Sequence, residues 1–162
     1  MRIQSLELKH WESVKKIYEQ GIATNNATFQ SEAPSWKEWD DSHLQHSRIV
    51  GIIDNEVVGW AALTLVSGRC VYAGVAEVSV YVNNLFSGKG YGKKILESLV
   101  VISELNNIWT LTAGIFPENK ASVSIHEKCG FKILGTREKI GQMNGQWRDV
   151  LLLERRSKTV GI

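Results

Sequence analysis

The chain has 162 residues, of which 43% are hydrophobic and 22% charged, and its formal net charge is +2. This size and composition are typical of one globular domain that needs no disulfide or metal, and they exclude a strongly basic nucleic-acid-binding protein, a transmembrane protein and a disulfide-rich scaffold. Since the N-terminus also lacks the apolar core of a signal peptide, we expect a single cytoplasmic domain over residues 1–162 with reduced thiols, no metal, and no nucleic-acid or membrane partner.

The N-terminal part of the chain predicts a strand, two helices and a hairpin. Residues 2–8 favour a short strand, and apolar residues from Trp11 to Ile22 recur at helical spacing. Ser35 and Glu38 have the spacing of a capping box, so a second helix is expected to begin there and to end near residue 45. The hairpin strands are expected at residues 48–53 and 57–65, on either side of the turn-like residues 54–56.

The C-terminal part alternates strands and helices. Residues 76–82 read A-E-V-S-V-Y-V, and this alternation predicts a strand with Glu77, Ser79 and Tyr81 on one face. The remaining expected elements are a helix after the glycine-rich residues 87–94, a strand at 109–115, a helix at 119–129 capped by Gly130, a strand at 131–140, a polar loop at 141–146 and a strand at 147–154. The order indicates an α/β fold (α+β in some schemes) with a mixed, mostly antiparallel central sheet of about seven strands flanked by four helices.

The glycine-rich stretch, S-G-K-G-Y-G-K-K at residues 87–94, does not fit two common phosphate-binding motifs. A P-loop needs a glycine, any four residues and then Gly-Lys-Ser/Thr, whereas Gly92 and Lys93 are followed by Lys94 and the first position is Ser87. A dinucleotide fingerprint, G-x-G-x-x-G, fails because its third glycine would be Lys93.

What remains is a strand that ends in a glycine-rich turn and leads directly into a helix. The first turn of a helix has unpaired N–H groups and the positive end of the helix dipole, and glycines let an anion approach them closely. Lys89, Lys93 and Lys94 add positive charge. A pyrophosphate is the natural ligand of such a turn. The alternative, that the glycines only form a tight strand-to-helix connection, is equally open.

Two segments of the chain together resemble the GCN5-related N-acetyltransferase (GNAT) superfamily. V-Y-V-N-N-L-F-S-G-K-G-Y-G at residues 80–92 resembles its acetyl-CoA motif, and N-K-A-S-V-S-I-H-E-K-C-G-F at residues 119–131 resembles its Asn-x-x-Ser…Gly-Phe segment. The segments A-T-F-Q-S-E-A-P (27–34), E-V-S-V-Y-V (77–82) and G-Q-W-R-D (145–149) are similar to the phosphinothricin and methionine sulfoximine acetyltransferase branch. The resemblance implies the GNAT fold, acetyl-CoA as co-substrate without a metal, and a homodimer.

Two positions depart from the superfamily pattern. Ser87 stands where the acetyl-CoA motif usually has arginine or glutamine, which removes a long polar side chain but no backbone donor. His126 stands where many members have a tyrosine that acts as general acid, and histidine is common there in the narrower branch.

The resemblance also implies how the coenzyme binds. The pantetheine amides would pair with main-chain groups of Val80 and Val82, and a backbone N–H near Tyr81 would polarise the thioester carbonyl. The pyrophosphate would lie on the N–H groups of the glycine-rich turn, with Asn119 and Ser122 contributing from the next helix. The cofactor-binding residues expected on this basis are Val80, Tyr81, Val82, Gly88, Lys89, Gly90, Tyr91, Gly92, Lys93, Asn119 and Ser122.

Two residues are candidates for proton transfer. Glu77 lies between apolar neighbours on the cofactor strand, so partial burial would raise its pKa and suit it to remove the amine proton. The alternative is a strand carboxylate that faces solvent or pairs with a lysine. His126 would protonate the leaving thiolate, since its ordinary pKa is close to neutral, or it would only make a local hydrogen bond.

The acceptor is expected to bind to Phe29, Glu32, Arg69 and Tyr72, which lie in loops before the cofactor strand. An arginine can bind an α-carboxylate through two parallel hydrogen bonds, so Arg69, and less strongly Arg148, is a candidate for that contact or else a solvated charge. We expect an enzyme that transfers acetyl directly, in a ternary complex, to the α-amino group of a small amino-acid-like molecule such as phosphinothricin or methionine sulfoximine. The alternatives are transfer to a protein N-terminus, a lysine or a polyamine, or a non-catalytic acyl-CoA-binding regulator.

Overall fold

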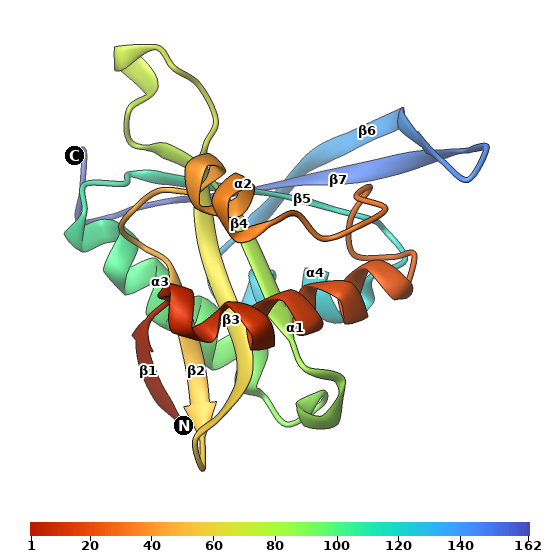
Figure 1. The fold of residues 1–162 in the computed structure, drawn as a ribbon. Helices are drawn as coiled ribbons and strands as arrows, with labels where there is room; N and C mark the ends of the chain where they lie inside the picture. Colours follow the sequence, from red (N-terminus) through yellow and green to blue (C-terminus); the bar gives the residue numbers. More distant parts are fainter.

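A computed structural model describes all residues from Met1 to Ile162 as one seven-stranded sheet with helices on both faces (Figure 1). This architecture confirms the expected fold class and order of elements. The elements are β1 (Arg2–Ser5), η1 (Leu8–His10), α1 (Trp11–Ala23), α2 (Trp36–Ser42), β2 (Ile49–Ile53), β3 (Glu56–Leu65), η2 (Cys70–Tyr72), β4 (Val75–Val82), η3 (Asn84–Phe86), α3 (Tyr91–Leu105), β5 (Thr110–Ile115), α4 (Lys120–Lys128), β6 (Lys132–Met143) and β7 (Gln146–Arg156), where η marks a short 3-10 helix.

The strands follow the spatial order β1-β2-β3-β4-β5-β7-β6, and every neighbouring pair is antiparallel except β4 and β5. The parallel pair is short, because only Val75–Glu77 of β4 pair with Thr110–Thr112 of β5. Beyond Glu77 the two strands continue without pairing to each other, although each stays paired on its other side. The sheet is therefore open between β4 and β5 from residue 78 onward.

Each face of the sheet has its own hydrophobic core. Helices α1 and α2 cover one face, where Val14, Ile17 and Trp39 pack on Trp60 of β3. Helices α3 and α4 lie on the other face, whose larger core is centred on the apolar side of α3. Strand β3 contributes to both cores, since alternate side chains point to opposite faces and residues 57–63 are all buried. None of the helices has the length and apolar character needed to cross a bilayer.

The capping box that the sequence predicts at α2 is present. The Ser35 hydroxyl accepts from the Glu38 backbone N–H, and the Glu38 carboxylate accepts from the Ser35 backbone N–H at 2.8 Å. The helix is shorter than expected and ends at Ser42, because His43 has an extended backbone. Strand β3 fixes the chain just after α2, because the Leu44 N–H donates to the Leu63 carbonyl of β3 at 2.8 Å.

The prediction of a polar loop at residues 141–146 is wrong. Strands β6 and β7 pair up to Met143 and Gln146, and only Asn144 and Gly145 form the turn. Both turn residues have positive φ angles, 51° and 77°, as a two-residue type I′ hairpin turn requires. Asn-Gly is the preferred sequence for this turn, so the polar composition of the segment concealed a hairpin. Its tip extends beyond the rest of the sheet (Figure 1).

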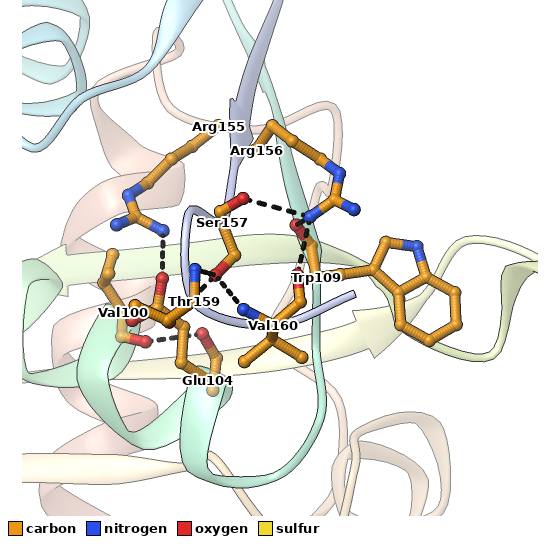
Figure 2. Close-up of polar contacts among 9 residues, drawn as sticks. Val100, Glu104, Trp109, Arg155, Arg156, Ser157, Thr159 and Val160 are labelled. Atoms are coloured by element: carbon orange, nitrogen blue, oxygen red, sulfur yellow. Dashed lines mark hydrogen bonds and ion pairs between the residues drawn. The ribbon is translucent and has the colours of Figure 1, made fainter. Parts of the chain in front are cut away.

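The C-terminal residues fold back on the end of α3 through a polar cluster (Figure 2). Arg155 forms an ion pair with Glu104 of α3 at 2.9 Å, and both side chains are only 20% exposed. Arg156 donates to the carbonyls of Trp109 and Val160 at 3.1 and 2.8 Å. Burial acts to raise the pKa of Glu104, but its hydrogen bonds with Arg155, Ser157 and Thr159 and the charge of Arg155 together outweigh burial and lower it.

Replacing Glu104 with glutamine should lower the free energy of unfolding at pH 7 by about 1 kcal/mol. Because the folded-state pKa is lowered, this stabilisation is complete above the unfolded value of 4.5 and is lost as pH falls through the folded value. Urea unfolding should therefore show a larger difference between Glu104→Gln and the parent at pH 7 than at pH 3. The exposed Glu97→Gln variant on the same helix is the control, with a smaller effect at pH 7. An equal loss at both pH values would contradict this account.

Candidate active site

The separation of β4 and β5 opens a cavity with a volume of about 1540 Å³, called here the interstrand cavity. Its walls come from both faces of the sheet because it passes between the two strands. The segment between α1 and α2, the end of β4, the start of α3, and parts of β5, α4, β6 and β7 all line it. Most residues that the sequence assigns to the cofactor, and Glu77, His126, Phe29 and Glu32, lie on these walls.

Strand β4 presents an unpaired edge to the interstrand cavity. The Val75 carbonyl accepts from Val66 and the Asn83 N–H donates to Val58, so the odd-numbered residues direct their peptide groups toward β3. The peptide groups of Val78, Val80 and Val82 therefore point to the other edge, where β5 has already diverged. An extended ligand can pair there as an added strand. This edge is the one on which the sequence places the pantetheine contacts.

The glycine-rich stretch forms an uncapped helix start at one end of this edge. Gly88 and Gly90 have positive φ angles of 74° and 80°, and Gly90 is the N-cap of α3 with no side-chain cap. None of the backbone N–H groups of residues 88–93 donates a hydrogen bond within the chain. A β-carbon at Gly88 or Gly90 would meet no atom within 4 Å. The geometry thus leaves a row of free donors in open space, which suits an anion.

The third glycine and the lysines play different parts. A β-carbon at Gly92 would lie 3.2 Å from Val82 and 3.4 Å from Ile125, so this glycine allows α3 to pack closely against β4 and α4. Lys93 lines the cavity and forms an ion pair with Glu97. Lys89 is not part of the lining; its ammonium donates to the Leu85 carbonyl at 3.2 Å.

Asn119 and Ser122 line the cavity at the start of α4 and also hold local structure. The Asn119 side-chain oxygen caps α4 by accepting from the Ser122 N–H at 3.2 Å, and its amide nitrogen donates to the Asn26 carbonyl at 3.1 Å. The side-chain oxygen of Asn119 can accept one further hydrogen bond, and its amide nitrogen can donate one more. Asn119 therefore joins the helix to the segment between α1 and α2 and still presents polar atoms to a ligand.

Glu77 lies where β4 and β5 part, in the last residue pair that the two strands share. Its carboxylate opens to the cavity and makes no ion pair within 4 Å. The residue is exposed by surface area, but the cavity walls around the carboxylate partly desolvate it and raise its pKa above the ordinary 4.5, while the positive charge of Arg137 acts in the opposite direction. A carboxylate with a raised pKa and no competing partner is suited to accept a proton.

His126 lies in α4 with its ring almost fully buried. Its Nδ1 donates to the Ser122 carbonyl at 2.8 Å, and its Nε2 has no hydrogen-bond partner within the chain. Burial lowers the pKa of the ring, and the bond to Ser122 offsets this only in part. The neutral ring thus holds its proton on Nδ1 and presents a lone pair at Nε2. A general acid would need the imidazolium form, which burial disfavours.

Phe29 and Glu32 line the cavity from the segment between α1 and α2. The Phe29 ring packs against Phe116 with ring centres 4.9 Å apart, and it fills the space beside Gly141 of β6, where a β-carbon would come within 2.7 Å.

Arg148 of β7 holds the same segment. Its guanidinium donates to the Asn25 carbonyl at 2.9 Å and to the Asn26 side chain at 3.0 Å, and it lies over the Phe116 ring. It also pairs with Glu118 at 3.2 Å. Arg148 is therefore engaged within the chain and does not line the cavity.

The structure does not bring Arg69 and Tyr72 to the cavity. Both belong to the excursion between β3 and β4, which extends away from the sheet at the top of Figure 1. The Arg69 guanidinium lies over the Tyr72 ring, 5.6 Å from its centre, and both side chains are exposed. Within one chain these two residues contact each other rather than the other expected acceptor residues.

The cavity-lining side chains that sequence reasoning missed include His43, Arg137 and Ile140. Arg137 and Ile140 lie in β6, which the sequence predicted only as a strand at residues 131–140, without a position in the sheet. The only available signal was the irregular pattern of residues 135–141, since alternation is interrupted there. His43 stacks on Trp39 with ring centres 4.1 Å apart, and burial lowers its pKa. No group of three or more histidine, cysteine or acidic side chains in the chain is arranged to hold a metal ion.

Comparison with known proteins gives a consistent result. Residues 3–152 match the acetyltransferase (GNAT) domain family. The Bacillus subtilis protein named "Putative phosphinothricin acetyltransferase YwnH" is 32% identical over 161 residues, which cover 96% of this chain and 98% of that protein. The Pseudomonas aeruginosa "L-methionine sulfoximine/L-methionine sulfone acetyltransferase" is 32% identical over 83 residues, 51% of this chain and 48% of that one.

A similar fold is seen in the crystal structure of a phosphinothricin acetyltransferase from Sinorhizobium meliloti in complex with AcCoA. It has a TM-score of 0.88 and 22% sequence identity, and the match covers 99% of this chain and 90% of that one. The family match over residues 3–152 and the 32% identity with the Bacillus subtilis protein confirm what the two motifs indicate. This protein belongs to the GNAT family of acetyltransferases and is related to the phosphinothricin and methionine sulfoximine acetyltransferases.

Proposed function

We propose that this protein transfers acetyl from acetyl-CoA directly to the α-amino group of a small amino-acid-like acceptor of the phosphinothricin or methionine sulfoximine type. The observation that carries the proposal is the interstrand cavity, in which an unpaired strand edge, an uncapped helix start and a carboxylate with a raised pKa lie together. The first two suit the coenzyme, and the third suits an amine that must lose a proton before it can attack.

The donor binds along β4 and the start of α3. Its pantetheine arm pairs with the peptide groups of Val80 and Val82, and its pyrophosphate lies on the free N–H groups between Gly88 and Lys93. Lys93 adds positive charge at that end. Ser87 contributes no long side chain to the phosphates, so backbone donors supply most of the contact. The structurally similar Sinorhizobium meliloti enzyme, in complex with AcCoA, supports this choice of donor.

The acceptor amine and the thioester then react within one ternary complex. Glu77 accepts a proton from the ammonium, directly or through a water, and the freed lone pair attacks the thioester carbonyl carbon. A C–N bond forms, the C–S bond breaks with its electron pair leaving on sulfur, and the nitrogen, which is positively charged after the attack, releases its second proton to the thiolate or to solvent. A β4 backbone N–H next to Tyr81, such as that of Val82, stabilises the oxyanion between bond formation and bond breaking. Much of the rate gain comes from holding both substrates together.

His126 has a lesser role in this mechanism. A thiol has an ordinary pKa near 8.5, so the coenzyme can leave as a thiolate without a proton donor of its own. The neutral His126 ring fixes the start of α4 through Ser122 and presents only a lone pair at Nε2. Donation from His126 to the thiolate would require the minor imidazolium form.

We also propose that two chains associate through the exposed apolar side chains of the β6–β7 hairpin. Ile133, Leu134, Ile140 and Trp147 are each between 45% and 60% exposed, which is unusual for large apolar residues on one hairpin. Sedimentation equilibrium should give twice the mass of one chain, and Trp147→Glu should shift the protein toward the monomer. A parent protein that is monomeric at micromolar concentration would contradict this assembly.

An acceptor panel tests the function as a whole. The parent protein, supplied with acetyl-CoA, should acetylate L-phosphinothricin or L-methionine sulfoximine with release of free thiol. Polyamines, lysine peptides and peptides with free N-termini should react at least about tenfold more slowly, because the acceptor is held by contacts specific to an amino acid. Turnover of polyamines alone, or tight acetyl-CoA binding with no turnover of any amine, would reject the proposal.

The glycine-rich turn can be tested with a matched pair of variants. Gly90→Ala and Gly145→Ala both place a methyl group at a positive φ, 80° and 77°, and neither methyl meets another atom. Both should therefore lose about 1–2 kcal/mol of stability. Only Gly90→Ala should raise KM for acetyl-CoA, by about tenfold, because its methyl stands beside the phosphate donors. An equal KM for acetyl-CoA in both variants would contradict the binding of the pyrophosphate at this turn.

Glu77→Gln tests the base. Removing the carboxylate should lower kcat by about 10²–10⁴-fold at neutral pH with little change in KM for acetyl-CoA. In the parent, activity should rise with pH through the pKa of Glu77, which lies above 4.5 because burial raises it. That rise should be absent from the pH profile of the variant. The exposed Glu56→Gln variant on β3 should match the parent, and full activity of Glu77→Gln at pH 7 would exclude its role.

A further inference from the structure

The basic side chains that line the interstrand cavity are few, and one of them has no partner. The basic residues in the lining are Lys93 and Arg137, and burial lowers the pKa of both lining histidines, His43 and His126. Lys93 lies at the start of α3 and pairs with Glu97. The Arg137 side chain is exposed and makes no hydrogen bond and no ion pair within the chain, whereas Arg48, Arg148 and Arg155 are all paired.

An irregularity in β6 directs Arg137 into the cavity. Arg137 pairs with Val150 and Gly141 pairs with Arg148, so three residues of β6 oppose a single residue of β7. Bulges of this kind bend a strand and change the direction of neighbouring side chains. Asp149 holds the bulge, since its carboxylate accepts from the Lys139 N–H at 2.8 Å. Arg137, which directly precedes the bulge, and Ile140, its last residue, both line the cavity.

Arg137 and Glu77 lie on the same face of the sheet. Glu77 pairs with Thr112, and alternate residues along β5 and β7 carry that face to Gly114, Val150 and Arg137. Gly114 has no side chain, and a β-carbon there would lie 3.2 Å from Val150. No side chain therefore rises from the sheet at Gly114, between Glu77 and Arg137. The Arg137 charge also acts on the Glu77 carboxyl, although the two groups form no ion pair.

We propose that Arg137 binds the α-carboxylate of the acceptor while Glu77 faces its amine, so that the cavity selects α-amino acids. This inference rests on the proposed acetyl transfer to a small amino-acid-like acceptor. An α-amino acid carries an ammonium and a carboxylate on one carbon, which matches an anion and a cation held apart across one cavity. A guanidinium can hold a carboxylate through two parallel hydrogen bonds, and Arg137 has all of its donors free. In this proposal Arg137 of β6 makes the carboxylate contact that the sequence assigned to Arg69.

The inference is tested with two acceptors that differ only in charge, L-methionine sulfoximine and its α-carboxamide. For Arg137→Gln, kcat/KM for the carboxylate should fall roughly 10- to 100-fold, while kcat/KM for the carboxamide stays within about threefold of the parent. Arg137→Lys keeps the charge but loses the planar fork, so its loss on the carboxylate should be intermediate. Lys132→Gln removes a positive charge from the same strand outside the cavity and should leave both acceptors unchanged.

Each other outcome has a definite meaning. If Arg137→Gln lowers kcat/KM equally for both acceptors and moves the pH profile, Arg137 acts on Glu77 and the inference is wrong. If the selective loss on the carboxylate appears in Arg69→Gln instead, the contact belongs to the excursion before β4 and the inference is equally wrong. If the parent acetylates neither acceptor, the proposed function fails, and the inference fails with it.

Discussion

The parallel pairing of β4 with β5 is the constraint on which the rest of the site depends. The two strands share three residue pairs and then separate at Glu77. Parallel strands need a crossover connection, and here it is α3, whose N-terminus must begin where β4 ends. The same arrangement therefore leaves the edge of β4 unpaired, places an uncapped helix start beside it and brings a carboxylate to the point of separation.

Stability and function use different parts of this architecture. The two hydrophobic cores lie on opposite faces of the sheet, and the larger one extends under both separating strands, from Val78 of β4 to Ala113 and Ile115 of β5. At the other end, Arg155 and Arg156 tie the C-terminal residues to α3 and to Trp109, which fixes β7 beside β5 (Figure 2). The charged groups that line the interstrand cavity, such as Glu77 and Arg137, belong to neither core.

The three glycines of the turn illustrate how one motif combines separate demands. Gly88 and Gly90 have backbone conformations that side chains disfavour, and they leave open space for a ligand. Gly92 has an ordinary backbone but lies against Val82 and Ile125, so it serves packing. The sequence left two explanations for these glycines open, a bound anion or a tight strand-to-helix connection. The conformations of Gly88 and Gly90 suit the first, and the close packing of Gly92 corresponds to the second.

Local patterns in the sequence determined much of this protein: the order of its elements, the capping box at α2, the alternation of β4, and the two motifs that indicate the GNAT family. These features depend on neighbours within a few residues, so periodicity and spacing reveal them. The Asn-Gly turn was also local, and it was missed only because its polar neighbours resembled a loop.

Only the tertiary structure decided which distant residues share the cavity. Arg69 is near Glu77 in sequence but lies on an excursion that leaves the sheet, whereas Arg137 is 60 positions away and faces the same cavity as Glu77. The physical reason is that β6 reaches this position through its pairing with β7, and a three-residue bulge then sets the direction of its side chains. Strand order and bulges arise from long-range pairing, which no local pattern encodes.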